Sequence, residues 1–265
     1  MERKRVSRQA LLRVARGRVL STQDLARALG VPPRNAAKAA FDLKARGFLK
    51  AVQRGVYAAV PLDTEPKGFQ PDPFLAVHRV LGDRYAFSHY SALALLGSER
   101  QVRRGVHVEA PGVRPRRRTV GTIPLHVHAL SSRAWEGATM EVRRGGTTLL
   151  VTNPPRTLVD LAALPEPEQD YEEVLGAFKS LLPRVDPADL WRAASGVGNT
   201  TALARLGHFL SRAVGDPPKF RGFETVLADL EHAVVRSSPK YLGTRPRDPS
   251  NRYDPRFKLV FPGGV

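Results

Sequence analysis

The 265-residue sequence contains no cysteine, which excludes disulfides, thiolate metal sites and a cysteine nucleophile. It contains no run of eighteen apolar residues, so no segment is predicted to span a membrane. Its basic N-terminal stretch lacks the unbroken apolar core of a secretion signal. Acidic residues are few, with 25 Asp and Glu against 42 Lys and Arg. These features are typical of a cytoplasmic protein, and we expect no membrane partner.

Motifs for catalysis are also missing from the sequence. There is no Gly-rich phosphate loop of the Walker type. There is also no cluster of carboxylates spaced to hold a metal ion beside a phosphate, as a nuclease requires. Ser88 and His89 offer a nucleophile and a base, but adjacent residues on one helix point in different directions. We therefore predict no catalytic residues and expect a protein that is not an enzyme.

Two histidines, His126 and His128, lie two positions apart in a predicted strand, so their side chains point to the same face. Such a pair can seat a metal ion, but the nearby sequence offers no acidic residue or further histidine to complete the coordination shell. We therefore favour an edge-strand pair without a metal. The sequence predicts no metal site and no cofactor.

The excess of positive charge is concentrated near the N-terminus. Residues 1–62 hold 14 Lys and Arg against 3 Asp and Glu, which gives +11 of the total net charge of +17. A genome rich in arginine codons is the alternative explanation, but it would spread the charge evenly along the chain. Because a positive surface attracts polyanions, the uneven distribution favours a nucleic-acid-binding module in this region.

Three helices are predicted near the N-terminus. The first covers residues 6–15, where apolar residues alternate with arginines. The second begins at Ser21, whose side chain can accept a hydrogen bond from the backbone of Asp24, and it ends at Gly30, which can adopt the left-handed conformation. The third covers residues 33–46, because proline suits the first turn of a helix.

The third of these helices is the candidate recognition helix. Two short β-like runs follow it, at 48–52 and 56–60, and predict a hairpin wing around a turn at 53–55. A helix-turn-helix places its second helix in the major groove, where Arg and Lys bond guanine and Asn bonds adenine, while wing residues contact phosphate. The alternative is that these side chains form only a solvated face. The predicted contacts with double-stranded DNA are Arg34, Asn35, Lys38, Lys50 and Arg54.

The rest of the chain predicts a mixed body, so the fold class is α+β with a helix-rich C-terminal half. Short β-like runs are concentrated between residues 104 and 151, and helical patterns dominate from 156 onward. The predicted organisation is a winged helix-turn-helix domain at 1–62, a linker at 63–73 and an α+β domain at 74–265, with candidate lobes at 74–163 and 164–265.

Three groups of arginines recur in this body. The run at 114–118 could make a second set of phosphate contacts, or it could be a solvated loop, since proline and arginine are common in exposed connections. The pairs at 103–104 and 143–144 leave the same alternatives, and folding could place all three groups on one face. The candidate second basic surface comprises Arg103, Arg104, Arg114, Arg116, Arg117, Arg118, Arg143 and Arg144.

Several short motifs occur in a fixed order along the chain. They are RGFL at 46–49, RGVY at 54–57, FSHYSAL at 87–93, PRTLVDL at 155–161, ALARLG at 202–207 and DPRFKL at 254–259. With these motifs the sequence resembles the AbiEi family, the antitoxins of type IV toxin–antitoxin systems. The segment from 164 to 194 has no clear counterpart in the family pattern.

The resemblance implies a protein with two functions. The winged domain would bind inverted repeats in its own promoter and repress the operon. The C-terminal domain would neutralise a nucleotidyltransferase-like toxin, in this family often without a stable complex. The resemblance also implies a positive surface on both domains. The arginine groups at 103–104, 114–118 and 143–144 would fit such a surface. A ligand-responsive winged-helix regulator without a toxin partner is the alternative, and a nucleic-acid-processing enzyme is a third hypothesis.

Overall fold

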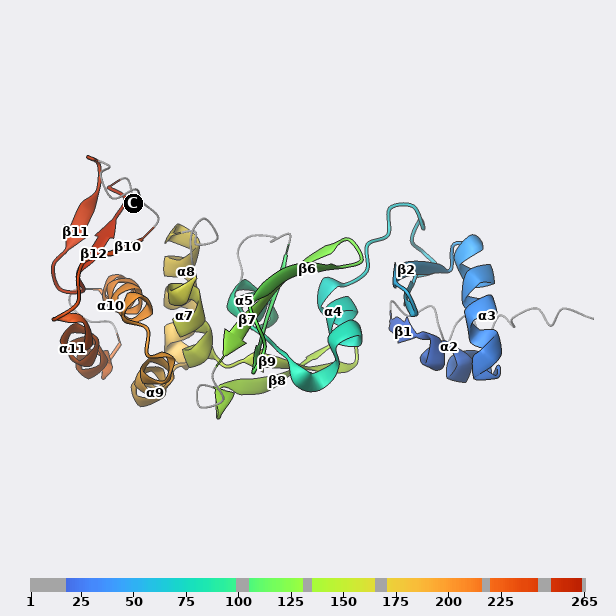
Figure 1. Ribbon diagram of the computed structural model, residues 1–265, viewed down its shortest axis with the longest axis horizontal. Helices are drawn as coiled ribbons and strands as arrows, with labels where there is room; N and C mark the ends of the chain where they lie inside the picture. The colour runs from blue at the N-terminus through green and yellow to red at the C-terminus, as the bar shows by residue number, and fades with distance from the viewer. Residues whose placement is uncertain are drawn as a thin grey trace, which may run out of the picture.

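The computed structural model describes residues 18–98, 105–130, 135–164, 171–215, 220–242 and 249–263. The molecule is elongated, and Figure 1 shows the N-terminal helices, a central sheet and a C-terminal group of helices following one another along the long axis. None of the described helices is long and apolar enough to cross a membrane. The helix predicted at 6–15 lies outside the described residues.

The N-terminal region contains two helices and a three-stranded antiparallel sheet with the order β1-β3-β2. Helix α3 packs Ala40 and Leu43 against Leu25 of α2 and Leu49 of the following strand. This sequence of helix, short turn, helix and hairpin is compatible with the predicted winged helix-turn-helix. The elements are β1 (Val19–Ser21), α2 (Thr22–Leu29), α3 (Pro33–Ala45), β2 (Leu49–Gln53) and β3 (Val56–Ala59).

Helix α2 begins and ends where its sequence predicts. The Ser21 side chain accepts a hydrogen bond from the Asp24 backbone N–H at 3.1 Å, and the Ser21 backbone N–H donates to Asp24 Oδ2 at 2.8 Å. This reciprocal pair is a capping box, which satisfies two backbone donors that a helix start leaves open. Gly30 follows the helix with φ of 65°, a conformation that residues with a Cβ rarely adopt.

The central body is built on a mixed six-stranded sheet with the order β6-β7-β5-β4-β9-β8. The pairs β5–β7 and β4–β9 are parallel, whereas β4–β5, β6–β7 and β8–β9 are antiparallel. The elements are α4 (Pro73–Leu81), a short 3-10 helix (Gly82–Arg84), β4 (Ala86–Phe87), α5 (His89–Leu95), β5 (Val106–Pro111), β6 (Arg116–Val120), β7 (Ile123–Leu130), β8 (Thr139–Arg144) and β9 (Thr147–Thr152).

The edge strand β6 corrects part of one sequence-based alternative, because residues 116–118 of the arginine run lie in a strand, whereas 114 and 115 lie outside it. Arginine gives no β signal of its own, so the sequence pattern did not reveal the strand. Pairing with β7, in the register Arg116 opposite Val127, decides the conformation. Charged side chains on an edge strand also protect the open edge of a sheet from pairing with another chain.

The wing packs directly against the central body. Val52, Val56 and Ala58 of the hairpin share one hydrophobic cluster with residues of the six-stranded sheet, including Val120. Gly121, in the turn after β6, has φ of 60°, and a Cβ at this position would lie 2.1 Å from the Val52 carbonyl oxygen. The approach of the two segments is therefore too close for any residue but glycine.

The C-terminal part is a layer of helices with a small three-stranded sheet, order β10-β12-β11, on its outer side (Figure 1). Helix α10 is buried along most of its length. Its Gly207 lies so close to the Phe257 ring that an added Cβ would be 2.2 Å from it. The elements are α7 (Pro154–Ala163), α8 (Tyr171–Leu181), a 3-10 helix (Leu182–Arg184), α9 (Pro187–Val197), α10 (Thr200–Val214), α11 (Phe223–Val234), β10 (Lys240–Tyr241), β11 (Arg252–Asp254) and β12 (Leu259–Phe261).

Candidate nucleic-acid interface and a buried polar cluster

The outward face of α3 carries the predicted base-reading side chains. Arg34, Asn35 and Lys38 are all exposed there. Phe41 is also exposed, at 70%, and its spacing of seven and three residues from Arg34 and Lys38 places it on the same side of the helix. Sequence reasoning missed Phe41, although its position outside the buried Ala36, Ala40 and Leu43 stripe was a usable signal.

The two wing residues differ in their surroundings. Arg54 is exposed at the tip of the hairpin. Lys50 is partly buried, and its ammonium donates a hydrogen bond to the Phe69 carbonyl oxygen at 2.5 Å, with Gln70 Oε1 at 3.5 Å. In this structure Lys50 therefore holds the segment after the wing against β2. Its contact with DNA stays a prediction.

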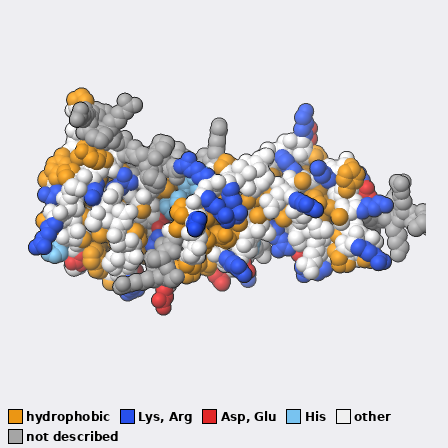
Figure 2. Space-filling view, in the orientation of Figure 1, with side chains coloured by type: hydrophobic (Ala, Val, Ile, Leu, Met, Phe, Trp, Pro, Cys, Tyr) orange, Lys and Arg blue, Asp and Glu red, His pale blue; other side chains and the backbone are white. Residues whose placement is uncertain are grey.

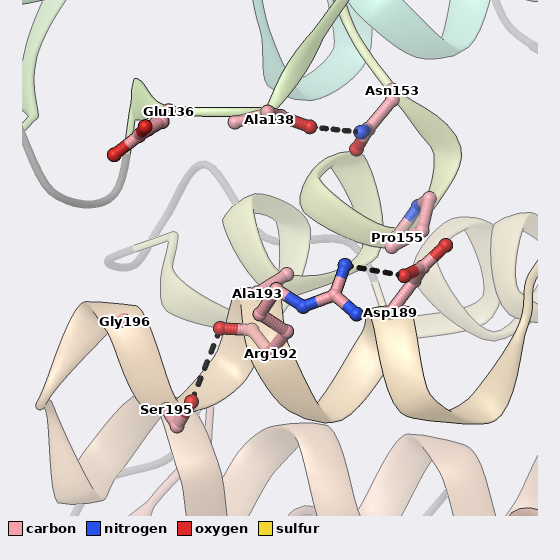
Figure 3. Close-up of a pocket in the computed structure, with 10 residues that line it drawn as sticks. Glu136, Ala138, Asn153, Pro155, Asp189, Arg192, Ala193, Ser195 and Gly196 are labelled. Atoms are coloured by element: carbon pink, nitrogen blue, oxygen red, sulfur yellow. Dashed lines mark hydrogen bonds and ion pairs between the residues drawn. The ribbon is translucent and has the colours of Figure 1, made fainter.

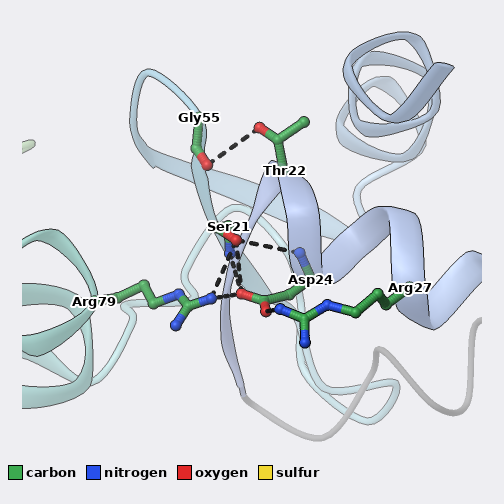
Figure 4. Close-up of polar contacts among 6 residues, drawn as sticks. All are labelled: Ser21, Thr22, Asp24, Arg27, Gly55 and Arg79. Atoms are coloured by element: carbon green, nitrogen blue, oxygen red, sulfur yellow. Dashed lines mark hydrogen bonds and ion pairs between the residues drawn. The ribbon is translucent and has the colours of Figure 1, made fainter. Parts of the chain in front are cut away.

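Polar contacts hold the helix-turn-helix against the central body, as Figure 4 shows. Arg79 of α4 forms an ion pair with Asp24 and donates a hydrogen bond to Ser21 Oγ at 3.1 Å. Asp24 also pairs with Arg27 at 2.9 Å. The residues that cap α2 are thus the same residues that bind α4, so the start of the helix and its attachment to the body depend on each other.

The arginine groups of the body lie at separate places. Strands β6 and β8 are the two outermost strands of the sheet. Arg114, Arg116 and Arg117 are exposed on and before β6, and Figure 2 shows Lys and Arg side chains gathered there. At the other edge Arg143 is exposed, whereas Arg144 donates a hydrogen bond to Asp72 at 2.6 Å. Arg103 and Arg104 lie outside the described residues, and Arg118 is partly buried on β6.

A second concentration of functional groups lies inside the central body, where four histidines meet. His89 begins α5, His107 lies on β5, and His126 and His128 lie on β7. His107 Nδ1 is 3.0 Å from His128 Nε2, and the His89 ring stacks on His128 with ring centres 4.0 Å apart. The His107 and His126 rings also stack, with centres 4.5 Å apart. Sequence reasoning grouped only His126 and His128 and considered His89 only beside Ser88, because these residues come from distant parts of the chain. The expected edge strand is wrong, because β7 lies between β6 and β5 in the sheet.

The environment of His89 and His128 favours their neutral imidazole forms. Burial lowers the pKa of His89 well below its ordinary value, and the neighbouring His128 and His107 lower it further. Burial, followed by His126 and Arg117, lowers the pKa of His128 to about 4. A neutral imidazole keeps a lone pair on one ring nitrogen, so these side chains can act as ligands or as hydrogen-bond acceptors at neutral pH.

Next to the histidines lies a buried group of one cation and two carboxyls. Arg156 Nε of α7 is 2.7 Å from Asp160 Oδ1, and Arg156 Nη2 is 3.6 Å from Glu109 Oε2. Burial, together with the charge of Asp160, raises the pKa of Glu109 to about 8. Burial raises the pKa of Asp160 to about 6 even though Arg156 acts in the opposite direction. The group therefore holds more negative than positive charge when both carboxyls are ionised.

A cavity of about 340 Å³ lies between the end of the sheet and α9 (Figure 3). Three of its polar side chains, Asn153, Arg192 and Ser195, already bond to neighbouring groups. Arg192 Nη1 is 2.6 Å from Asp189 Oδ1, and Ser195 Oγ donates to the Arg192 carbonyl oxygen at 3.1 Å. Asn153 Oδ1 accepts from the Arg156 backbone N–H and caps α7. These groups stabilise helices and do not converge on a ligand.

The fold and these two sites define a protein with an N-terminal helix-turn-helix joined to an α+β body. Residues 85–212 match the family described as the AbiEi antitoxin C-terminal domain. This part of the chain is therefore similar to AbiEi antitoxin C-terminal domains, which supports the resemblance that the sequence motifs indicated. The whole polar cluster lies within it.

The crystal structure of the RV2827C protein from Mycobacterium tuberculosis has a similar fold. The TM-score is 0.66 and the sequence identity is 18%, over 96% of this chain and 90% of that chain. At this identity the likeness concerns the fold, and it extends over the N-terminal region as well as the antitoxin domain. No curated protein sequence matches the chain.

Proposed function

We propose that the protein is the antitoxin of a type IV toxin–antitoxin system and that it also represses its own operon by binding promoter DNA. The observation that carries this proposal is the AbiEi antitoxin domain at 85–212, which is joined to a helix-turn-helix with a basic outward face. The partner that the family resemblance implies is a nucleotidyltransferase-like toxin, neutralised with or without a stable complex.

In this proposal α3 reads the operator from the major groove. Arg34 and Lys38 can bond guanine and Asn35 can bond adenine, which are the side-chain pairings that groove geometry favours. Phe41 supplies an apolar contact of the kind that recognises a thymine methyl group. Phe41 is 70% exposed beside these basic side chains, so it is accessible for such a contact.

The proposed DNA surface continues from the wing onto the body. Arg54 at the hairpin tip would contact phosphate or the minor groove. The turn after β6 touches the wing at Val52, so the exposed arginines of β6 belong to the part of the body next to the wing. We propose that Arg116 and Arg117 add phosphate contacts there, which would raise affinity without adding sequence preference.

A salt-titrated gel shift tests the repressor half of the proposal. The full-length protein is expected to bind its own upstream DNA more tightly than a scrambled duplex. Arg34→Ala or Lys38→Ala is expected to weaken specific binding by about 1–3 kcal/mol and to change the preferred base at one position. Arg192→Ala is a matched control, because Arg192 is exposed on α9, far along the molecule from α3. Equal binding of both duplexes would contradict the proposal.

Point variants are a better test than removal of residues 1–62. The wing residues Val52 and Val56 are buried against the body, so a truncation would expose an apolar surface and could abolish binding by unfolding the protein. Surface variants on α3 avoid this problem because their side chains are exposed. Thermal unfolding should give the same Tm for Arg34→Ala, Lys38→Ala and the parent protein.

Co-expression tests the antitoxin half. A neighbouring nucleotidyltransferase-like gene is expected to arrest growth, and the full-length protein is expected to restore it. Failure to restore growth would favour the alternative, a ligand-responsive regulator. One candidate ligand site is a cleft of about 570 Å³ near the junction of α2 and α4, which is lined by charged side chains that include Arg27 and Arg79. Small-molecule sites are mostly apolar, so this lining favours the antitoxin.

A further inference from the structure

Three of the histidines in the central body come from three separate elements and meet at one point. One ring nitrogen from each of His89, His107 and His128 lies within 4.8 Å of the others. These elements are the start of α5, strand β5 and strand β7, which are separated by long stretches of sequence. Neither DNA binding by α3 nor the motifs of the antitoxin domain assign a role to this convergence.

The surroundings of His89 favour the binding of an ion. Its Nδ1 is 2.8 Å from Ser88 Oγ, so Nε2 is the nitrogen that we assign to the ion. A histidine that bonds a neighbour through one nitrogen and a metal through the other is the usual arrangement in metal sites. His89 also has φ of 52°, an uncommon conformation for a residue with a Cβ, and such residues concentrate at functional sites.

Buried carboxyl groups lie directly beside the histidines. Carboxyl oxygens of Glu109 and Asp160 are within 4.8 Å of a His89 ring nitrogen, and both residues are at most 2% exposed. Among the described residues, Glu109 Oε1 and Asp160 Oδ2 have no hydrogen-bond partner. Because buried polar atoms without a partner are costly, a nearby cation would stabilise this arrangement.

We propose that His89, His107 and His128 bind one divalent transition-metal ion, such as Zn²⁺. Imidazole nitrogens suit zinc and its neighbours among the transition metals. Three protein ligands leave one position of a tetrahedral site for a water molecule. The carboxyl groups of Glu109 and Asp160 lie beside the histidines and each has one oxygen without a hydrogen-bond partner among the described residues. We assign them a supporting role, because Arg156 already contacts Asp160 at 2.7 Å.

Binding requires the histidine rings to turn. In a tetrahedral zinc site the ligand nitrogens are about 3.4 Å apart, which follows from Zn–N distances of about 2.0–2.1 Å. The His107 and His128 nitrogens are already 3.0 Å apart. The His89 ring stacks on His128 with the ring planes 26° apart, so it must rotate before one of its nitrogens faces the common point. This rotation involves the side chain, because the backbone of the three residues is held in α5, β5 and β7.

Metal titration of the full-length protein tests the proposal directly. Untagged protein treated with EDTA is titrated with Zn²⁺ by calorimetry and with Co²⁺ by visible absorption. We expect one equivalent of saturable binding and the absorption bands of tetrahedral Co²⁺. His128→Gln is expected to lower the affinity for Zn²⁺ at least 10-fold. His232→Gln, at an exposed position of α11, is the matched control and should bind as the parent protein does.

Two results would overturn the proposal. One is the absence of saturable binding at one equivalent, and the other is equal affinity in His128→Gln and the parent protein, which would indicate adventitious binding at the surface. His128 is only partly buried, so this variant is expected to fold. Thermal unfolding provides a second readout, because a ligand that binds only the native state raises Tm. Zn²⁺ should raise the Tm of the parent protein and of His232→Gln, but not that of His128→Gln.

Discussion

The helix-turn-helix region and the central body place their charged side chains in different ways. On α3 and the wing tip, Arg34, Lys38 and Arg54 point outward and are exposed. In the body, Arg156 is buried beside Asp160 and Glu109. An exposed cation costs little and attracts an external polyanion. A buried charge needs partners within the fold. The comparison therefore separates charges available for binding from charges that fix the structure.

The largest change in the free energy of unfolding is expected when the buried ion pairs of Arg156 are broken. Arg156→Met leaves two buried carboxylates without their cation and is expected to lower the free energy of unfolding by about 3–5 kcal/mol. Arg192→Ala removes an exposed pair with Asp189 and is expected to cost at most about 1 kcal/mol. Urea denaturation of both variants measures the difference. Similar losses in the two variants would show that burial does not separate these charges as we describe.

A smaller loss of stability is expected from a variant at the junction between the helix-turn-helix region and the central body. Ser21→Ala removes the cap of α2 and the oxygen that accepts from Arg79, and it is expected to cost about 0.5–2 kcal/mol of stability. Ser195→Ala is the matched control, since its hydroxyl donates only to a carbonyl within its own helix. An unchanged Tm in Ser21→Ala would mean that neither the cap nor the contact with α4 stabilises the protein.

The pair of Asp254 and His208 in the C-terminal part gives a pH-dependent test of whether charges with partners inside the fold stabilise it. Asp254 Oδ2 is 2.8 Å from His208 Nδ1. Partial burial raises the pKa of Asp254, but hydrogen bonds from His208 and the Phe257 backbone N–H outweigh it, and the net effect lowers the pKa. The stabilisation is thus present above the unfolded pKa of about 3.9 and is lost as pH falls through the lower folded value.

Asp254→Asn removes this titrating group. The parent protein is expected to lose stability more steeply than the variant below about pH 4, because only the parent must protonate a carboxylate that the native state holds ionised. Denaturant unfolding at several pH values between neutral and acid measures the two slopes. Parallel slopes would show that Asp254 has the same pKa in the native and unfolded states.

The smallest effect on the protein itself is expected at the wing tip. Arg54→Ala should leave stability unchanged, because the side chain is exposed. If Arg54 contacts a phosphate, the variant weakens binding to all sequences and reduces the slope of log affinity against log salt by about one. Gel shifts at four or more salt concentrations measure this slope. An unchanged slope would assign Arg54 to the solvated surface.

Much of the local structure could be predicted from the sequence, because helix ends depend on neighbouring residues. Ser21, Asp24 and Gly30 set the limits of α2 through contacts within a few positions. The outward position of Arg34 and Lys38 also follows from helical spacing. The strand at 116–120 could not be predicted in this way, because its conformation comes from pairing with β7.

The sequence by itself determined helices α2 and α3, the α+β class and the motifs that resemble AbiEi antitoxins, since these depend on composition and short-range spacing. Only the tertiary structure placed His89 and His107 beside His128, because that convergence depends on the register of β5 and β7 and on the start of α5. The tertiary structure also places the Lys50 ammonium in a hydrogen bond with the segment after the wing, whereas Arg54 is exposed. Contacts between residues far apart in sequence arise from packing and strand pairing, which no local pattern specifies.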